Sequence, residues 1–148
     1  FDVCGLVQEI VDATQRKYSD VSALQIQGQF PGGPCAVSGD RTQIRQVFVN
    51  LAKNAVEAMN ERGVLQIVVV SGPSYVEVRF DDEGAGIGPD KVARIFEPFY
   101  TTKEHGVGMG LAICMRIVIA HDGTIRAASR QGGGTSMTVR LPLVRAEE

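Results

Sequence analysis

An apolar stripe along one long predicted helix constrains the fold more than any other feature of the sequence. Beyond residue 40, apolar side chains recur at the three- and four-residue intervals that place them on one helix face. Asp40 precedes the stripe and is a suitable N-cap, and we expect the helix to end near Gly63. The stripe consists of Ile44, Val47, Phe48, Leu51, Ala55 and Met59. A helix with one apolar face must bury that face against a second layer of structure.

The rest of the chain supplies that layer as predicted strands. Runs of alternating or β-branched residues predict strands at 65–71 and 75–81, joined by a turn, and at 124–129 and 136–141 around QGGGT. Leu24, Ile26 and Phe30 alternate as in a strand, and Ala36 and Val37 predict a second, short one. Further helices are predicted from residue 3, from Pro89 to Ile95 and from Leu111 to His121. The pattern predicts an α+β, two-layer α/β sandwich with a mixed, mostly antiparallel sheet covered on one face by helices.

Length and composition narrow the classes of function. The 148 residues suit one domain, 1–148, and the net charge of −2 gives no broad field for nucleic acid or a membrane surface. Cys4, Cys35 and Cys114 form no CxxC pair, so we expect free thiols in a reducing, cytoplasmic compartment and no zinc site. No apolar run approaches the roughly 20 residues that span a bilayer. Because Phe1 opens the chain within an apolar pattern, we expect an excised fragment of a longer protein.

Two asparagines on the long helix are candidates for metal or phosphate binding. Asn50 and Asn54 are four positions apart, so their amide oxygens lie on the same helix face. Mg²⁺ prefers oxygen ligands and is usually completed by water and substrate phosphates, so one amide oxygen is sufficient from the protein. Lys53 and Arg45 can neutralise phosphate charge from the same helix. For an isolated NxxxN, side chains that only face solvent are the more common explanation.

The segment DEGAGIG favours a planar ligand that approaches the backbone closely. Asp82 follows a predicted strand, and the absence of Cβ atoms at Gly84 and Gly86 leaves room beside it. An ionised carboxylate only accepts hydrogen bonds, which suits the amino group of adenine and rejects the carbonyl of guanine. Ile87 is placed to cover the ring. An acidic, glycine-rich turn without a ligand is the alternative when this segment is considered alone.

Two later segments suggest a phosphate site. Gly106, Gly108 and Gly110 lead into the predicted helix that begins at Leu111, and the free N–H groups of a helix N-terminus attract phosphate. Lys103 precedes them at the end of IFEPFYTTK, where Phe96 and Phe99 either pack in the core or face a partner. Near the C-terminus, Gly134 and Thr135 form a shorter glycine element, whose Thr hydroxyl can support the phosphate side.

Together these segments resemble a known family. QIRQVFVNLAKNAVEAM, DEGAGIG, IFEPFYTTK and GVGMGLAI resemble, in this order, the asparagine box, first glycine box, phenylalanine box and second glycine box of the ATP-binding domain of sensor histidine kinases. The resemblance extends from about residue 40 to the C-terminus. The sequences of the motifs are most similar to those of oxygen-sensing and nitrogen-regulatory kinases. It departs from the family at Met109, where Leu is usual, and at Asp122, where Gly is usual.

The resemblance implies a Bergerat-type fold with an ATP lid, and ATP and Mg²⁺ as cofactors. Asn54 corresponds to the metal ligand, and Asn50, Lys53 and Asn54 to the catalytic group. The implied nucleotide-binding residues are Asn54, Asp82, Gly84, Gly86, Ile87, Lys103, Gly106, Gly108, Gly110, Leu111 and Thr135. Related ATPases carry Glu at the position of Asn50, where it activates water; because an amide cannot take a proton from water, the site suits phosphoryl transfer better than hydrolysis.

The family also implies partners outside this sequence. A γ-phosphoryl group would pass to a histidine on a separate dimerisation domain, for relay to a response regulator, and the full-length protein would be a homodimer. Residues 1–15 resemble the connection from that missing domain. Neither His105 nor His121 is a convincing phosphoacceptor. Two alternatives remain open: a non-catalytic nucleotide-binding module, and an ATPase or serine kinase of the same superfamily. The sequence does not decide whether the parent protein is membrane-anchored.

Overall fold

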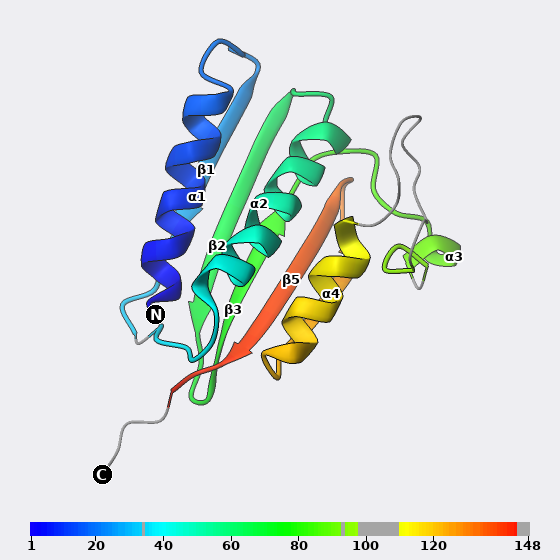
Figure 1. The fold of residues 1–148 in the computed structure, drawn as a ribbon. Coiled ribbons are helices and arrows are strands. Elements are labelled where there is room, and N and C mark those ends of the chain that lie inside the picture. Colours follow the sequence, from blue (N-terminus) through cyan, green and yellow to red (C-terminus); the bar gives the residue numbers. More distant parts are fainter. Residues whose placement is uncertain (34, 93, 98–109, 145–148) are drawn as a thin grey trace.

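A five-stranded sheet forms one layer of the molecule, and three helices lie against one of its faces (Figure 1). The structure is a computed structural model that describes residues 1–33, 35–92, 94–97 and 110–144. Its strands are β1 (Leu24–Gln29), β2 (Gly63–Ser71), β3 (Tyr75–Asp81), β4 (Thr124–Ser129) and β5 (Thr135–Pro142). Its helices are α1 (Val3–Lys17), α2 (Arg41–Ala58), the short α3 (Pro89–Val92) and α4 (Gly110–Ala120).

The sheet has the order β1-β2-β3-β5-β4, and only β1 and β2 pair in parallel. The other three pairings are antiparallel, so the predicted mixed, mostly antiparallel sandwich is confirmed. At the end of β3, the central strand, Asp81 pairs with Gln66 of β2 and Ser136 of β5. The next residue, Asp82, therefore leaves the sheet from its middle, directly after the best-supported strand.

Helix α2 forms as its sequence pattern predicts. The carboxylate of Asp40 accepts hydrogen bonds from the backbone N–H groups of Thr42 and Gln43, at 2.9 and 3.2 Å. The apolar stripe is buried against the sheet, where the rings of Phe48 and Phe80 lie 5.8 Å apart between centroids. These contacts fix α2 over the central strand β3, on the side of the sheet that carries the core.

The end of α2 differs slightly from the prediction. The helix stops at Ala58, because Asn60 and Glu61 adopt left-handed backbone conformations with φ of 53° and 57°. Gly63 therefore does not end the helix. It begins β2 with a φ of 110°, a conformation that glycine adopts without strain.

Three smaller sequence predictions are wrong. Strand β1 ends at Gln29, and Phe30, which precedes a proline and is 39% exposed, lies outside it. The short strand expected at residues 36 and 37 is a single antiparallel bridge between Ala36 and Asp2, because α1 begins at the next residue. Helix α3 ends at Val92 instead of continuing to Ile95. Residues 94–97 form turns, and the side chain of Ile95 is nevertheless buried.

The other helices complete one core. The buried face of α1 includes Leu6 and Ile10, so the segment predicted as a connection contributes directly to this domain. Helix α4 packs beside α2 and buries Cys114 and Val118. Among the described residues, no helix is long and apolar enough to cross a bilayer. The core therefore lies between the sheet and the layer formed by α1, α2 and α4.

Candidate functional site

Asp82 is held in a fixed, buried position beyond the end of β3. Asp82 is only 4% exposed. Its Oδ1 accepts hydrogen bonds from the backbone N–H groups of Gly84 and Thr135, at 2.9 and 3.2 Å. Its own backbone N–H donates to the carbonyl oxygen of Thr135 at 2.9 Å. Within the described residues Oδ2 has no such partner, so one carboxylate oxygen is anchored and the other is available to a ligand.

The charge of Asp82 is set by opposing effects. Burial is the largest and raises the pKa of this carboxyl above its ordinary value of 3.8, because the charged form loses hydration. The hydrogen bonds from Gly84 and Thr135 and the positive charge of Arg130 lower the pKa, and the neighbouring Asp81 raises it. The site thus holds a hydrogen-bond acceptor with little water around it, which favours a specific polar contact.

Glycines bring backbone segments close to Asp82. A Cβ atom at Gly84 would lie 2.6 Å from the carbonyl oxygen of Ala58, at the end of α2. A Cβ atom at Gly134 would overlap the carbonyl oxygen of Asp82, and the φ of 100° at Gly134 also favours glycine. Gly86, with φ of 81°, lies against Gly134. Three parts of the chain therefore meet around the carboxylate of Asp82: the first glycine segment (residues 82–88), the end of α2 and the turn before β5.

The two asparagines lie on α2, and Asn50 contacts α4. Both are partly exposed, and the Nδ2 atom of Asn50 lies 3.8 Å from the Sγ of Cys114, at hydrogen-bonding distance for sulfur. Asn54, one turn later on the same face, also has a polar contact in the structure. Lys53 is exposed. The asparagine face of α2 thus points toward the helix that follows the second glycine segment, as a site shared by the two would require.

The second glycine segment is described only in part. Gly110 and Leu111 begin α4, both partly exposed, with Leu111 packed against the core. Lys103, Gly106 and Gly108 lie outside the described residues, as do Phe99, Met109 and His105. Phe96 packs against the core, which supports the packing interpretation for that phenylalanine.

Comparison with known proteins identifies the family. A family model described as histidine kinase-, DNA gyrase B-, and HSP90-like ATPase matches residues 39–145. The chain belongs to this ATPase family. Within it, the chain is similar to Sporulation kinase C of Bacillus subtilis, with 43% identity over 109 residues, which are 74% of this chain and 26% of that protein. The chain thus spans about a quarter of the length of that relative.

Solved structures of the ATPase family agree with the fold. The catalytic domain of histidine kinase ThkA superposes with a TM-score of 0.86 at 30% identity, covering 96% of this chain and 93% of that one. Full-length ShkA in complex with AMPPNP has a TM-score of 0.87 at 27% identity, covering all of this chain and 31% of ShkA. The resemblance to the catalytic, ATP-binding domain of sensor histidine kinases is confirmed, whereas the nearer resemblance to one subgroup remains a prediction.

Within this ATPase domain, the described residues fit a purine nucleotide. Because the glycines beside Asp82 carry no side chains, a planar ligand can approach the backbone there. The second carboxylate oxygen of Asp82 can accept a hydrogen bond from an exocyclic amino group. Asn54 offers an amide oxygen suited to Mg²⁺, on the helix next to α4. A separate hollow of about 400 Å³ beside the end of α1, lined in part by Gln15, Tyr18 and Leu24, contains none of the family motifs. The family motifs therefore lie around Asp82 and not at that hollow.

Two predicted binding residues lie beside Asp82. Thr135 is buried, and its backbone donates to Asp82 and accepts from it, so its position is fixed by the carboxylate. The role predicted for its hydroxyl, on the phosphate side, remains a prediction. Ile87 is partly buried, and its carbonyl oxygen accepts a hydrogen bond of 2.6 Å from Ser129. The bond fixes the backbone of the first glycine segment against β4.

Arg130 contacts Asp82 although no sequence motif predicts it. Its Nη1 donates to the carbonyl oxygen of Asp82 at 2.8 Å, and its positive charge lowers the pKa of the Asp82 carboxyl. The residues are 48 positions apart, and only the basic residue ahead of the GGGT turn could have suggested the contact. Asp81 was also given no role. It is buried, pairs with Arg79 at 2.7 Å and accepts a hydrogen bond from Ser136.

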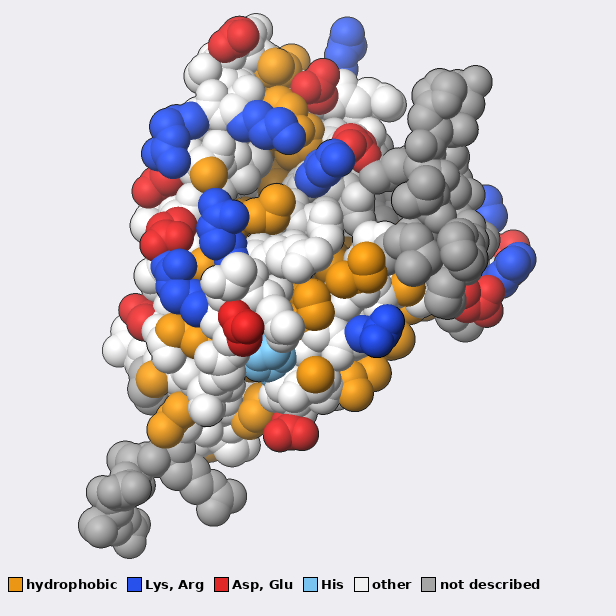
Figure 2. Space-filling view, in the orientation of Figure 1, with side chains coloured by type: hydrophobic (Ala, Val, Ile, Leu, Met, Phe, Trp, Pro, Cys, Tyr) orange, Lys and Arg blue, Asp and Glu red, His pale blue; other side chains and the backbone are white. Residues whose placement is uncertain are grey.

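The surface over the helices carries charges of both signs. Lys and Arg side chains and Asp and Glu side chains are interspersed on this face (Figure 2). This distribution agrees with the small net charge of −2. Attraction of a nucleotide therefore depends on local groups and not on a broad positive field.

Proposed function

We propose that this chain binds Mg-ATP and transfers the γ-phosphoryl group to a histidine on a separate dimerisation domain, for relay to a response regulator. Residues 1–148 would form the ATP-binding catalytic domain of a longer, homodimeric kinase acting in the cytoplasm. The observation that carries the proposal is the fixed carboxylate of Asp82, with one oxygen held by two backbone N–H groups. Membership in the ATPase family supports the nucleotide, and the kinases among its relatives support the reaction.

The proposed division of roles is based on the family motifs and, for the described residues, is supported by the positions of their side chains. Asp82 accepts a hydrogen bond from the adenine amino group. Gly84 and Gly86 leave room for the adenine ring, and Ile87 covers it. Asn54 is the proposed ligand of Mg²⁺, which when bound neutralises phosphate charge. Lys53 is exposed on the same helix and supplies positive charge at its surface. Lys103, Gly106, Gly108, Gly110 and Leu111 are proposed to surround the phosphates.

Transfer is favoured over hydrolysis by the group at position 50. Asn50 carries an amide, whose Nδ2 lies beside the sulfur of Cys114. An amide has no basic lone pair at neutral pH, so it cannot activate water as a carboxylate would. We propose that the acceptor imidazole lies on the separate dimerisation domain. His121 is a poor candidate for the phosphoryl acceptor, because both nitrogens of its ring contact backbone groups, the N–H of Asp40 and the carbonyl oxygen of Ile117.

Partners are proposed from the relatives. Histidine kinase ThkA has been solved in complex with the response regulator protein TrrA, with a TM-score of 0.84 to this chain at 28% identity. We propose that a response regulator is likewise the final acceptor for the protein to which this chain belongs. The helical domain that carries the phosphoaccepting histidine would contact the segment around Phe96. No nucleic acid and no direct membrane contact are proposed.

A thermal-shift experiment tests the adenine site. We expect MgADP to raise the melting temperature and MgGDP to leave it unchanged, because a ligand that binds only the folded state stabilises it. Asp82→Asn should lose the preference for ADP, since an amide can present a donor where the carboxylate only accepts. Asp90→Asn, an exposed change on α3, is the matched control and should retain the preference. Equal shifts by both nucleotides in the unsubstituted chain would contradict the adenine assignment.

Phosphoryl transfer needs a separate experiment. Labelled ATP is added to the chain together with a helical domain from a related kinase that carries the acceptor histidine. Acid-labile label on that domain supports a histidine kinase, because phosphohistidine is acid-labile. Tight ADP binding without any transfer would favour a non-catalytic module, acid-stable label a serine kinase, and rapid phosphate release by the chain alone an ATPase.

A further inference from the structure

Two cysteines far apart in the sequence meet at the start of α1. The Sγ atoms of Cys4 and Cys35 lie 2.6 Å apart, in direct contact, although 31 positions separate the residues. Cys35 is buried, whereas Cys4 is partly exposed. The nucleotide site uses neither residue. The spacing of the cysteines in the sequence predicts no pair, so the contact is a result of the fold.

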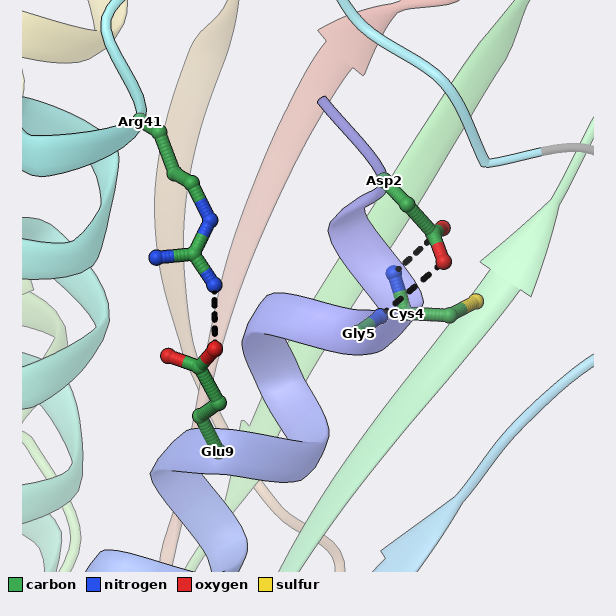
Figure 3. A network of polar contacts seen from close by, with 5 residues as sticks. All are labelled: Asp2, Cys4, Gly5, Glu9 and Arg41. Atoms are coloured by element: carbon green, nitrogen blue, oxygen red, sulfur yellow. Dashed lines mark hydrogen bonds and ion pairs between the residues drawn. The ribbon is translucent and has the colours of Figure 1, made fainter.

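The backbone holds the two cysteines together from both sides. The N–H of Val3 donates to the carbonyl oxygen of Cys35 at 2.9 Å, and Phe1 and Val37 exchange two hydrogen bonds of 2.9 Å. Asp2 pairs with Ala36 between them and caps α1 by accepting from the N–H groups of Cys4 and Gly5, at 3.1 and 3.3 Å (Figure 3). The short ladder positions Cys4 next to Cys35.

The chemistry of this pair distinguishes a disulfide from a metal site. The Asp2 carboxylate lies with both sulfurs in one cluster, so a metal ion is the first alternative. Two thiolates on a tetrahedral zinc ion, each about 2.3 Å from it, would be roughly 3.8 Å apart, which is well beyond the observed separation. The Asp2 carboxylate is also already engaged with two N–H groups of α1. Both features favour direct bonding between the sulfurs.

We propose that Cys4 and Cys35 form an intramolecular disulfide by exchange with a low-molecular-weight disulfide. The Cys4 thiolate attacks one sulfur of the small disulfide and releases one small thiolate. Cys35 then loses its proton to solvent and attacks the Cys4 sulfur, which releases the second small thiol. Two protein thiols are oxidised and one small disulfide is reduced to two thiols. Cys4 reacts first because it is the partner that solvent reaches.

The bond would join the start of α1 to the segment that leads into α2. It would close a loop containing β1 and restrict the unfolded chain, so the oxidised form should melt at a higher temperature, by up to about 10 °C. Burial raises the pKa of the Cys4 thiol to about 12, with the contact to Cys35 as the next cause. Little thiolate is therefore present at neutral pH, and exchange should take hours.

Oxidised glutathione tests the proposal on the 148-residue chain. After incubation we expect a mass loss of two hydrogens with no bound glutathione. After digestion with trypsin without reductant, the disulfide should keep the peptide that ends at Arg16 joined to the peptide that ends at Arg41. Cys114, buried elsewhere against α2, should remain a free thiol that alkylates after unfolding. Dithiothreitol should restore the original mass and the lower melting temperature.

Two variants sharpen the test. In Cys35→Ser the exchange should stop at a glutathione adduct on Cys4, whereas the matched control Cys114→Ser should still form the internal bond. The thermal shift with MgADP should be the same in the oxidised and reduced forms, so failure of the disulfide and failure of the nucleotide site are distinguishable. A stable adduct on Cys4 in the unsubstituted chain, or one equivalent of zinc retained by the reduced chain after dialysis, would overturn the proposal.

Discussion

At the scale of single residues, the stability of the fold and the proposed binding of a nucleotide make opposite demands on Asp82. The carboxyl is buried, and burial raises its pKa even though two backbone N–H groups and Arg130 favour the charged form. A folded-state pKa above the unfolded value means that ionisation at neutral pH costs folding free energy. That contribution is favourable below the unfolded pKa and is lost as the pH rises through the folded pKa. The site therefore keeps a charge that the fold alone would not favour.

Asp82→Asn should accordingly be at least as stable as the unsubstituted chain at about pH 7.5, because the amide oxygen can still accept from Gly84 and Thr135 without a buried charge. The advantage should shrink as the pH falls through the raised pKa of Asp82. Urea unfolding at several pH values measures this difference. If Asp82→Asn is less stable than the unsubstituted chain by the same amount at every pH, the predicted gain in stability is contradicted. Such a result would show that the amide fits the turn poorly.

Arg130 should act as a positioning residue for Asp82. In Arg130→Met the hydrogen bond to the carbonyl oxygen of Asp82 and the nearby positive charge are both lost. Because that charge lowers the pKa of Asp82, its removal should raise the pKa further, so ADP affinity should decline at a higher pH than in the unsubstituted chain. We expect a loss of up to about tenfold at neutral pH that shrinks in alkaline solution.

The control for this experiment is Arg126→Met, an exposed change on β4, the strand that ends one residue before Arg130. Its binding profile against pH should match that of the unsubstituted chain. A uniform loss of ADP affinity in Arg130→Met at all pH values would instead indicate a purely structural role for the arginine.

At the scale of elements, His121 connects the end of α4 to the start of α2. Its Nε2 accepts a hydrogen bond of 3.0 Å from the backbone N–H of Asp40, and its Nδ1 lies 2.7 Å from the carbonyl oxygen of Ile117. In this arrangement one ring nitrogen contacts α4 and the other contacts the N-cap of α2. The approach of its ring to Gly39, where a Cβ atom would clash, explains glycine at that position. The helices that carry the asparagines and the second glycine segment are thus joined at their far ends.

His121→Ala should weaken the domain by about 1 kcal/mol, the usual value of one net hydrogen bond, because the Asp40 N–H loses its partner. Arg116→Ala, an exposed change on α4, should have a much smaller effect. Chemical denaturation of both variants measures the difference. If the two variants unfold at the same urea concentration, the histidine contact does not contribute to stability.

The elements that could be predicted from the sequence are those whose signals are local. The cap at Asp40, the apolar stripe of α2 and the strands that flank the SGPS turn each depend on residues within one element, and the structure confirms them. The contacts that were missed join distant positions: Arg130 with Asp82, His121 with Asp40, and Cys4 with Cys35. No single segment contains the information for such contacts, because the sheet order decides which residues meet. Family motifs indicated the candidate nucleotide site but not the groups that contact Asp82 from elsewhere in the chain.

At the scale of the whole molecule, the site depends on how α2 is held over the sheet. Helix α2 carries Asn50 and Asn54, whereas Asp82 follows β3, so a common nucleotide requires these two elements to keep one relative position. Phe48 on α2 and Phe80 on β3 are both fully buried and in contact, with ring centroids 5.8 Å apart. The aromatic pair therefore supports both the core and the geometry of the candidate site.

Phe48→Ala should lower the free energy of unfolding by about 3–5 kcal/mol, because the change removes buried apolar surface and leaves a cavity between helix and sheet. The matched control is Phe30→Ala, since Phe30 is 39% exposed beyond the end of β1 and its loss should cost far less. Urea unfolding gives both values. In Phe48→Ala at temperatures where the chain remains folded, MgADP affinity should also fall, because α2 can shift relative to β3. Unchanged affinity in that variant would show that the asparagine helix and Asp82 do not need the aromatic contact to bind one ligand.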